Sequence, residues 1–177
     1  MTASKKDGPA WPGEIYDVFK QVGIKQVAYV PDAGHTQLIK SCHADRSMNV
    51  ISLTTEEEGV AMLAGAWLGG QRGALLMQSS GVGNCINMLS LMNECRFPLL
   101  MLVTMRGEWG EFNPWQIGMG QGTPAAFENA GVIVQRIPTA EEVREFVFAG
   151  AQLTFNTSRP VALLISQRIV GFKDWSK

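Results

Sequence analysis

The sequence has few of the residues that build disulfide frameworks and metal centres. Its three cysteines, Cys42, Cys85 and Cys95, are odd in number, and none stands in a C-x-x-C pair. Its two histidines, His35 and His43, lack metal-ligand spacing to a second ligand. The cysteines therefore predict reduced thiols in a cytosolic protein, and we expect no transition-metal site built by the chain itself.

Charge is also scarce. Charged residues make up 18% of the sequence, against about 25% in an ordinary soluble domain, and the formal net charge is −1. No basic cluster is present, which argues against electrostatic binding of nucleic acid. The longest apolar run, residues 59–70, is too short to cross a bilayer, and the polar residues 1–13 do not resemble a signal peptide. We expect a cytoplasmic protein that binds neither nucleic acid nor membrane.

The length of 177 residues fits a single domain over residues 1–177, with residues 1–12 expected to be flexible. Apolar residues make up 46% of the chain. This apolar content, together with the low charge, is typical of a chain whose surface is partly covered by a partner. A monomer with a large core is the alternative.

Helix-like and strand-like patterns alternate along the chain. The expected helices cover residues 14–23, 35–45, 54–70, 85–95, 124–131 and 139–155. The expected strands cover residues 26–31, 49–54, 73–80, 98–107, 132–137 and 160–166, with a turn at 81–84 and a Gly/Trp-rich loop at 107–123. Continuous apolar strands between helices predict an α/β fold with a doubly wound, mostly parallel sheet and helices on both faces.

In such a sheet, ligands bind beyond the carboxyl ends of the strands. The turns at those ends are residues 31–35, 54–58, 79–84 and 104–122. The unusual polar residues of the sequence lie in these four turns, so we expect the functional site there.

Three consecutive glutamates open the expected helix at 54–70. Thr55 and Glu58 have the spacing of a capping box, and acids are favoured at a helix N-terminus. Glu56 is in line with the apolar positions of one face, which are Val60, Leu63, Ala64 and Trp67. Because the helix is apolar nearly all round, periodicity leaves open whether Glu56 points inward as a functional group or only stabilises the helix end. The role of Glu57 is undecided.

Two other turns have alternative interpretations. The stretch from Gly81 to Asn84 is not G-x-G-x-x-G, and a tight turn with Asn84 capping the next helix explains it. Arg106 either pairs with Glu108 or Glu111, or binds an anion through its planar guanidinium.

Two sequence blocks carry a family resemblance that runs from about residue 14 to residue 166. The pattern E-x-x-x-V-A-x-x-A-G at 56–65 resembles the pyrimidine-binding domain of thiamine diphosphate enzymes. The blocks MQSSGVGNCINMLSLMNE (77–94) and PLLMLVTMRGEWGE (98–111) resemble the phosphonopyruvate and sulfopyruvate decarboxylases, especially the α subunit of the two-subunit sulfopyruvate enzymes. The resemblance implies a lyase that decarboxylates an anionic 2-keto acid, with thiamine diphosphate as cofactor.

The resemblance also implies residue roles. Gapless matching places on Glu56 the family's glutamate, which hydrogen-bonds the aminopyrimidine ring and so promotes formation of the reactive ylid. It places Gly81 and Asn84 at the cofactor. His35 would protonate the intermediate or bind an anionic group, whereas an exposed histidine in a glycine turn is the alternative. The residues implied for substrate binding are Asp32, Gln78, Ser80, Arg106 and Gln121.

Thiamine enzymes hold the diphosphate and Mg²⁺ on a second domain, whose signature is GDG followed by Asn. This sequence contains no GDG. We therefore expect a hetero-oligomer in which a separate β-type subunit carries the GDG…N motif and binds most of the Mg²⁺. The segment 109–122 is rich in Trp and Gly, which suggests a lid over the site. Two alternatives remain: a carboligase subunit with the same cofactor, or a non-catalytic regulatory subunit.

Overall fold

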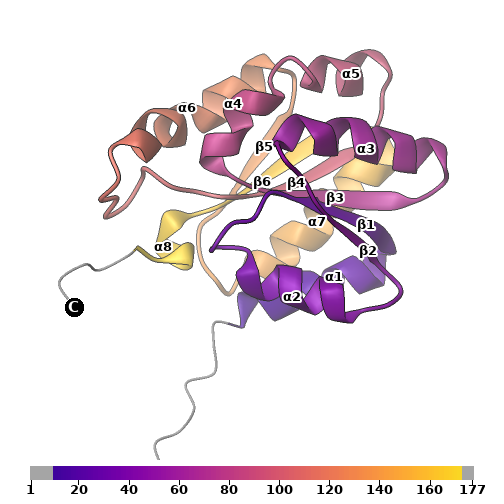
Figure 1. Cartoon of the computed structure of the whole chain (residues 1–177), viewed down its shortest axis with the longest axis horizontal. Coiled ribbons are helices and arrows are strands. Elements are labelled where there is room, and N and C mark those ends of the chain that lie inside the picture. Colours follow the sequence, from indigo (N-terminus) through magenta and orange to yellow (C-terminus); the bar gives the residue numbers. More distant parts are fainter. Residues whose placement is uncertain (1–9, 173–177) are drawn as a thin grey trace, which may run out of the picture.

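The protein is built on a six-stranded sheet in which every neighbouring pair is parallel, in the order β2-β1-β3-β4-β6-β5 (Figure 1). The computed structural model describes residues 10–172. The strands are β1 (Ile24–Tyr29), β2 (Asn49–Ser52), β3 (Arg72–Gln78), β4 (Leu99–Thr104), β5 (Ile133–Ile137) and β6 (Pro160–Ile165). The central strands β4 and β6 are buried at every position, as continuous apolar runs predict. The expected doubly wound α/β fold is confirmed.

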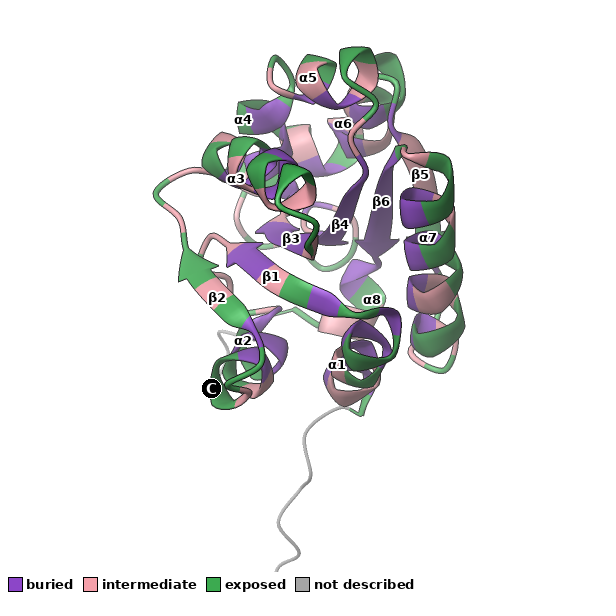
Figure 2. Cartoon of the chain, turned by 90° about the vertical axis from the view of Figure 1, so that its right-hand side faces the viewer, coloured by how far each residue is buried: buried purple, intermediate pink, exposed green. Residues whose placement is uncertain are grey.

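Helices cover both faces of the sheet (Figure 1). α1 (Trp11–Val22), α2 (Thr36–Ala44) and α7 (Val143–Thr157) pack on one face. The other face carries α3 (Glu56–Leu68), η1 (Ser79–Gly81), α4 (Val82–Cys85), α5 (Leu89–Glu94) and α6 (Trp115–Asn129). α8 (Gln167–Val170) follows β6 at the carboxyl edge. Figure 2 shows buried positions on the sides of the helices that meet the sheet and exposed positions on their outer sides. Over residues 10–172, the helices are too short or too polar to cross a bilayer.

The first helix begins earlier than the sequence pattern predicts. α1 starts at Trp11, and both Trp11 and Pro12 are buried, so the expected flexibility of residues 1–12 is wrong for these two. Proline is favoured in the first turn of a helix because its missing N–H would have had no helical partner there. Residues 1–9 lie outside the described part of the chain.

The expected loop at 107–123 is wrong over its second half. α6 begins at Trp115 and continues through Pro124 to Asn129. Its glycines, which suggested a loop, permit close packing: a Cβ at Gly120 would overlap the backbone carbonyl of Arg106. The part of the suggested lid that is a loop is therefore limited to residues 107–114.

The segment after β3 also differs from expectation. β3 ends at Gln78 rather than Ser80, and a 3₁₀ turn leads directly into the short α4. The helix expected at 85–95 is thus divided into α4 and α5. Asn84 lies inside α4 and does not cap it. Its side chain is instead directed to another partner, Glu56.

Candidate active site

Glu56, Gly81 and Asn84 come together although 25 residues or more separate Glu56 from the other two in sequence. Glu56 is the first residue of α3 and is only 6% exposed. Asn84 Nδ2 donates a hydrogen bond of 2.8 Å to Glu56 Oε2. The carboxylate also lies directly against Gly81, where an added Cβ would overlap Oε1 and Cδ. Within residues 10–172, Oε1 accepts no hydrogen bond.

The neighbouring glutamates have different roles. Glu58 Oε2 accepts a hydrogen bond of 2.9 Å from the backbone N–H of Thr54, so it satisfies an amide just outside the helix. The Thr55 hydroxyl donates to Glu57 rather than capping a helical amide, and this bond lowers the pKa of the Glu57 carboxyl. The expected capping box is therefore wrong in both halves, because Glu58 accepts from Thr54 rather than from the N–H of the N-cap residue Thr55. The sequence had left Glu57 without a role.

A second network joins the ends of β1, β3 and β4. Asp32 Oδ1 accepts a hydrogen bond of 2.9 Å from Gln78 Nε2, and Asp32 Oδ2 accepts one of 2.6 Å from Thr104 Oγ1. Asp32 Oδ2 also accepts from the N–H of Gly34, and Ser80 Oγ donates 2.8 Å to Gln78 Oε1. The structure thus brings together Asp32, Gln78 and Ser80. Thr104 was missed, although a hydroxyl that ends a continuous apolar strand was a usable signal.

Arg106 pairs with Glu111, which confirms the pairing alternative. Its Nε and Nη2 donate bonds of 2.6 Å to the two carboxylate oxygens. The guanidinium lowers the pKa of Glu111 to about 2. Glu111 also accepts a hydrogen bond of 2.9 Å from Gln167 Nε2. The charge of Arg106 is therefore balanced within the chain.

The segment between β4 and α6 is held at several points. Gln167, fully buried at the start of α8, accepts hydrogen bonds from the backbone N–H groups of Glu108 and Trp109. Gln121 Nε2 donates 2.7 Å to the carbonyl of Gly107, so this predicted substrate residue ties α6 to the segment. Gln167 was missed because its role depends on β4 and β6 being neighbours. These anchors restrain the segment that the sequence suggested as a lid.

His35 is completely buried, so the alternative of an exposed histidine is wrong. Its Nε2 donates 3.1 Å to the carbonyl of Leu102 on β4, and Nδ1 has no partner within residues 10–172. Burial lowers the pKa of His35, against a smaller opposing effect of Asp32. The imidazole is therefore neutral near pH 7 and is enclosed beneath the Asp32 turn.

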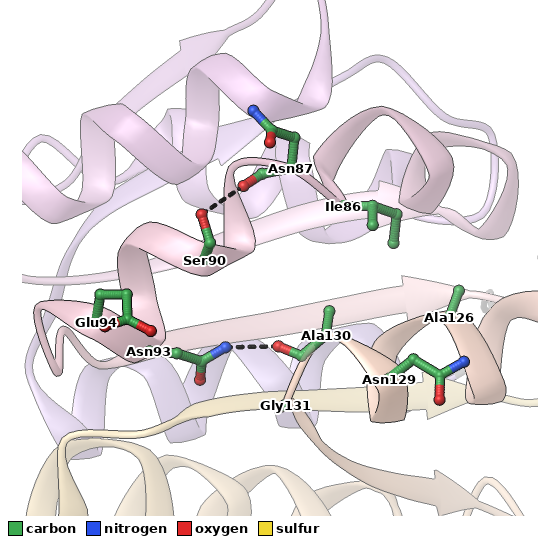
Figure 3. A pocket seen from close by; sticks show the side chains of 9 residues that line it. All are labelled: Ile86, Asn87, Ser90, Asn93, Glu94, Ala126, Asn129, Ala130 and Gly131. Atoms are coloured by element: carbon green, nitrogen blue, oxygen red, sulfur yellow. Dashed lines mark hydrogen bonds between the residues drawn. The ribbon is translucent and has the colours of Figure 1, made fainter.

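One wide cleft lies away from these residues. It has a volume of about 680 Å³ between α5 and α6 and is lined mainly by small and amide side chains, of which Asn93 donates to the carbonyl of Ala130 (Figure 3). A smaller cleft of about 160 Å³ is lined in part by Asp32, Thr104 and Arg106. We place the site by chemistry rather than by volume. No cluster of three His, Cys, Asp or Glu side chains suited to a metal ion occurs between residues 10 and 172.

Residues 14–116 match the family of thiamine pyrophosphate enzymes through its N-terminal TPP binding domain. The chain is 34% identical over 152 residues to the sulfopyruvate decarboxylase subunit alpha of Methanococcus maripaludis, covering 85% of this chain and 91% of that protein. It is 32% identical to the phosphonopyruvate decarboxylase of Streptomyces viridochromogenes over 85% of this chain but only 38% of that protein.

A solved structure, the 2-oxoglutarate:ferredoxin oxidoreductase from Magnetococcus marinus, matches with a TM-score of 0.67 and 12% identity. The match covers 88% of this chain and 28% of the other, and at that identity it supports the fold alone. The sequence relatives carry the family assignment, and they confirm the resemblance seen in the two sequence blocks. The chain belongs to the family of thiamine pyrophosphate enzymes, within the region of their N-terminal TPP binding domain.

Proposed function

We propose that this chain is the α subunit of a thiamine diphosphate-dependent decarboxylase that converts an anionic 2-keto acid into an aldehyde and CO₂. The substrate class is sulfopyruvate- or phosphonopyruvate-like, because relatives carrying both names match most of the chain. The observation that carries the proposal is Glu56. It is a nearly buried carboxylate with a single donor, at the carboxyl edge of the sheet and inside the region that matches the TPP binding domain.

The residues around Glu56 fit the pyrimidine end of thiamine diphosphate. Gly81 lacks the Cβ that would overlap the Glu56 carboxylate, and Glu56 Oε1 is without a donor among residues 10–172. A buried carboxylate with an open acceptor position can share a proton with a ring nitrogen placed against it. When bound, the cofactor supplies the nucleophilic carbon and the electron sink for loss of CO₂. Glu56 would hold the ring through a hydrogen bond at Oε1 and would exchange a proton with the ring nitrogen there.

We assign Asp32, Gln78 and Ser80 to the substrate side of the same edge. Both oxygens of Asp32 accept hydrogen bonds, so its position is fixed by its neighbours. Ser80 is exposed and its oxygen can still accept a hydrogen bond. Arg106 is already paired with the Glu111 carboxylate, and Gln121 already donates to the Gly107 carbonyl. We therefore assign both residues to the wall of the site rather than to direct substrate binding. His35, being enclosed, supports the turn rather than donating a proton to substrate.

We further propose that a β-type subunit supplies the GDG…N motif, the diphosphate site and most of the Mg²⁺ coordination. The chain spans 91% of an alpha-subunit relative but only 40% of the sulfopyruvate decarboxylase of Methanosarcina acetivorans. The longer relatives thus contain additional sequence that the alpha-type relatives lack. This length difference favours a hetero-oligomer.

Co-expression with a candidate chain that contains GDG tests the function. CO₂ release is measured from sulfopyruvate, phosphonopyruvate and pyruvate, with and without thiamine diphosphate and Mg²⁺. We expect cofactor-dependent release only from the mixed complex. Sulfopyruvate or phosphonopyruvate, which carry a second anionic group, should be preferred over pyruvate. CO₂ release that yields a product joining two keto acids, in place of the free aldehyde, would replace simple decarboxylation by carboligation. Full turnover without thiamine diphosphate would overturn the proposal.

A further inference from the structure

One helical turn holds the Glu56 carboxylate at two points. Gly81 and Asn84 are three residues apart, so both face the same side of the turn formed by η1 and α4. Gly81 contacts the Oε1 side of the carboxylate, and Asn84 Nδ2 donates to Oε2. We propose that Asn84 is a positioning residue that fixes the orientation of the Glu56 carboxylate and leaves Oε1 free. This inference rests on the proposed function of Glu56.

The contact geometry supports positioning. A glutamate side chain has three rotatable bonds, and packing on Gly81 alone would still permit the carboxylate to rotate about the last of them. The hydrogen bond from Asn84 to one specific oxygen removes this freedom. The remaining oxygen, Oε1, then has a defined place beside the Gly81 surface. Asn84 therefore selects which oxygen is available to a ligand.

The chemistry of the amide supports the same role. An asparagine donates a neutral hydrogen bond, so it orients a carboxylate without cancelling its charge. A lysine or arginine would form an ion pair, as Arg106 does with Glu111. No Lys or Arg is paired with Glu56 within residues 10–172. A neutral donor suits a group that must take up and release a proton.

Two variants separate hydrogen bonding from shape. Asn84→Asp keeps the shape of the side chain but replaces the donor by an acceptor, and Asn84→Leu removes the polar group. The control is Asn87→Leu, an exposed asparagine in the following turn with no contact to Glu56. Because Asn84 is itself exposed, neither variant is expected to prevent folding. Thermal unfolding of each variant checks this point.

The first readout needs no cofactor. In the ¹⁵N-labelled chain, the NMR signal of the Asn84 side-chain amide should shift on titration with acid, and this shift should disappear in Glu56→Gln.

The second readout is hydrogen–deuterium exchange at the reactive carbon of thiamine diphosphate bound to the mixed complex. We expect both Asn84 variants to slow exchange by about 10- to 100-fold, since a hydrogen bond to a charged group is lost. The KM for the keto acid should stay within about twofold, because the substrate side is untouched.

The outcomes distinguish the inference from the function. If Asn84→Asp exchanges at the wild-type rate while Glu56→Gln is inactive, the function stands and the positioning role is wrong. If Glu56→Gln keeps full exchange, the proposed function itself fails. Equal losses in Asn84→Leu and Asn87→Leu would show a general disturbance of the segment and overturn the specific role.

Discussion

Glu56 and Glu111 are two enclosed carboxylates near the carboxyl edge of the same sheet, and they differ in how many donors surround them. The Glu111 side chain is 3% exposed and accepts hydrogen bonds from Arg106, from Gln167 and from the backbone N–H groups of Gly107 and Asn113. Glu56 is 6% exposed and accepts one hydrogen bond, from Asn84. Both carboxylates are enclosed, but among residues 10–172 only Glu56 has an oxygen without a donor.

This difference fits a structural role for Glu111 and the proposed reactive role for Glu56. A buried carboxylate costs free energy unless donors replace the water it has lost. The donors around Glu111 meet that requirement and hold the segment after β4 in place. Glu56 Oε1 accepts no hydrogen bond from residues 10–172, which leaves an acceptor position for the proposed cofactor. Substitutions at Glu56 and at Glu111 should therefore have different consequences.

The largest effect should come from Glu56→Gln, because an amide cannot exchange a carboxyl proton. We expect kcat of the mixed complex to fall by at least about 100-fold, in the range that a proton-transfer group contributes. Thermal stability of the chain should change little. The matched control is Glu57→Gln in the same helical turn, which should remain within about threefold of wild type. Steady-state CO₂ release measures both.

A second variant tests the close contact between Gly81 and the Glu56 carboxylate. Gly81→Ala places a methyl group where the carboxylate now lies, although the backbone at this position is compatible with any residue. We expect displacement of Glu56 and a loss of about 100-fold in kcat. In Gly83→Ala the added Cβ meets only Met119 Sδ at 3.4 Å, so activity should stay within about twofold. Equal losses in both variants would contradict the steric explanation.

Much of the Glu56 site could be predicted from sequence, because the fold follows from continuous apolar strands and places strand-to-helix turns together. Glu56, Gly81 and Asn84 lie in two such turns, and the structure brings them into contact. The donor set of Glu111 could be predicted only in part. Pairing with Arg106 was one alternative from sequence, but Gln167 reaches Glu111 only because β6 is next to β4.

α6 shows why local signals failed nearby. Its glycines have low helix propensity and predicted a loop up to residue 123, so the helix was expected to begin only at Pro124. The helix forms because Gly120 lets its backbone approach the carbonyl of Arg106, a contact with a residue 14 positions earlier. Tertiary packing outweighs propensity here, and a sequence pattern read over one segment does not contain that information.

Glu111→Gln should act on stability rather than on chemistry. It leaves the largely enclosed Arg106 without its ionic partner, so the free energy of unfolding should fall by about 3 kcal/mol. In the double variant with Arg106→Met, the loss should be smaller than the sum of the single losses. The control is Glu108→Gln: its partner Arg136 is 45% exposed, so the change should stay below about 1 kcal/mol. Urea unfolding measures the wild type, the two single variants, the double variant and the control.

The smallest effect is a pH dependence that Glu111 imposes on the stability of the chain. Arg106 holds the pKa of Glu111 at about 2 in the folded chain, below the ordinary value of 4.5. The folded state therefore binds this proton less readily than the unfolded state, and Glu111 stabilises the fold fully above about pH 4.5. That contribution is lost as the pH falls from 4.5 towards 2. The difference in unfolding free energy between wild type and Glu111→Gln should shrink over this window, whereas the difference for Glu108→Gln should stay small throughout. A constant difference for Glu111→Gln down to pH 3 would mean that the loss comes from packing and not from the charge on Glu111.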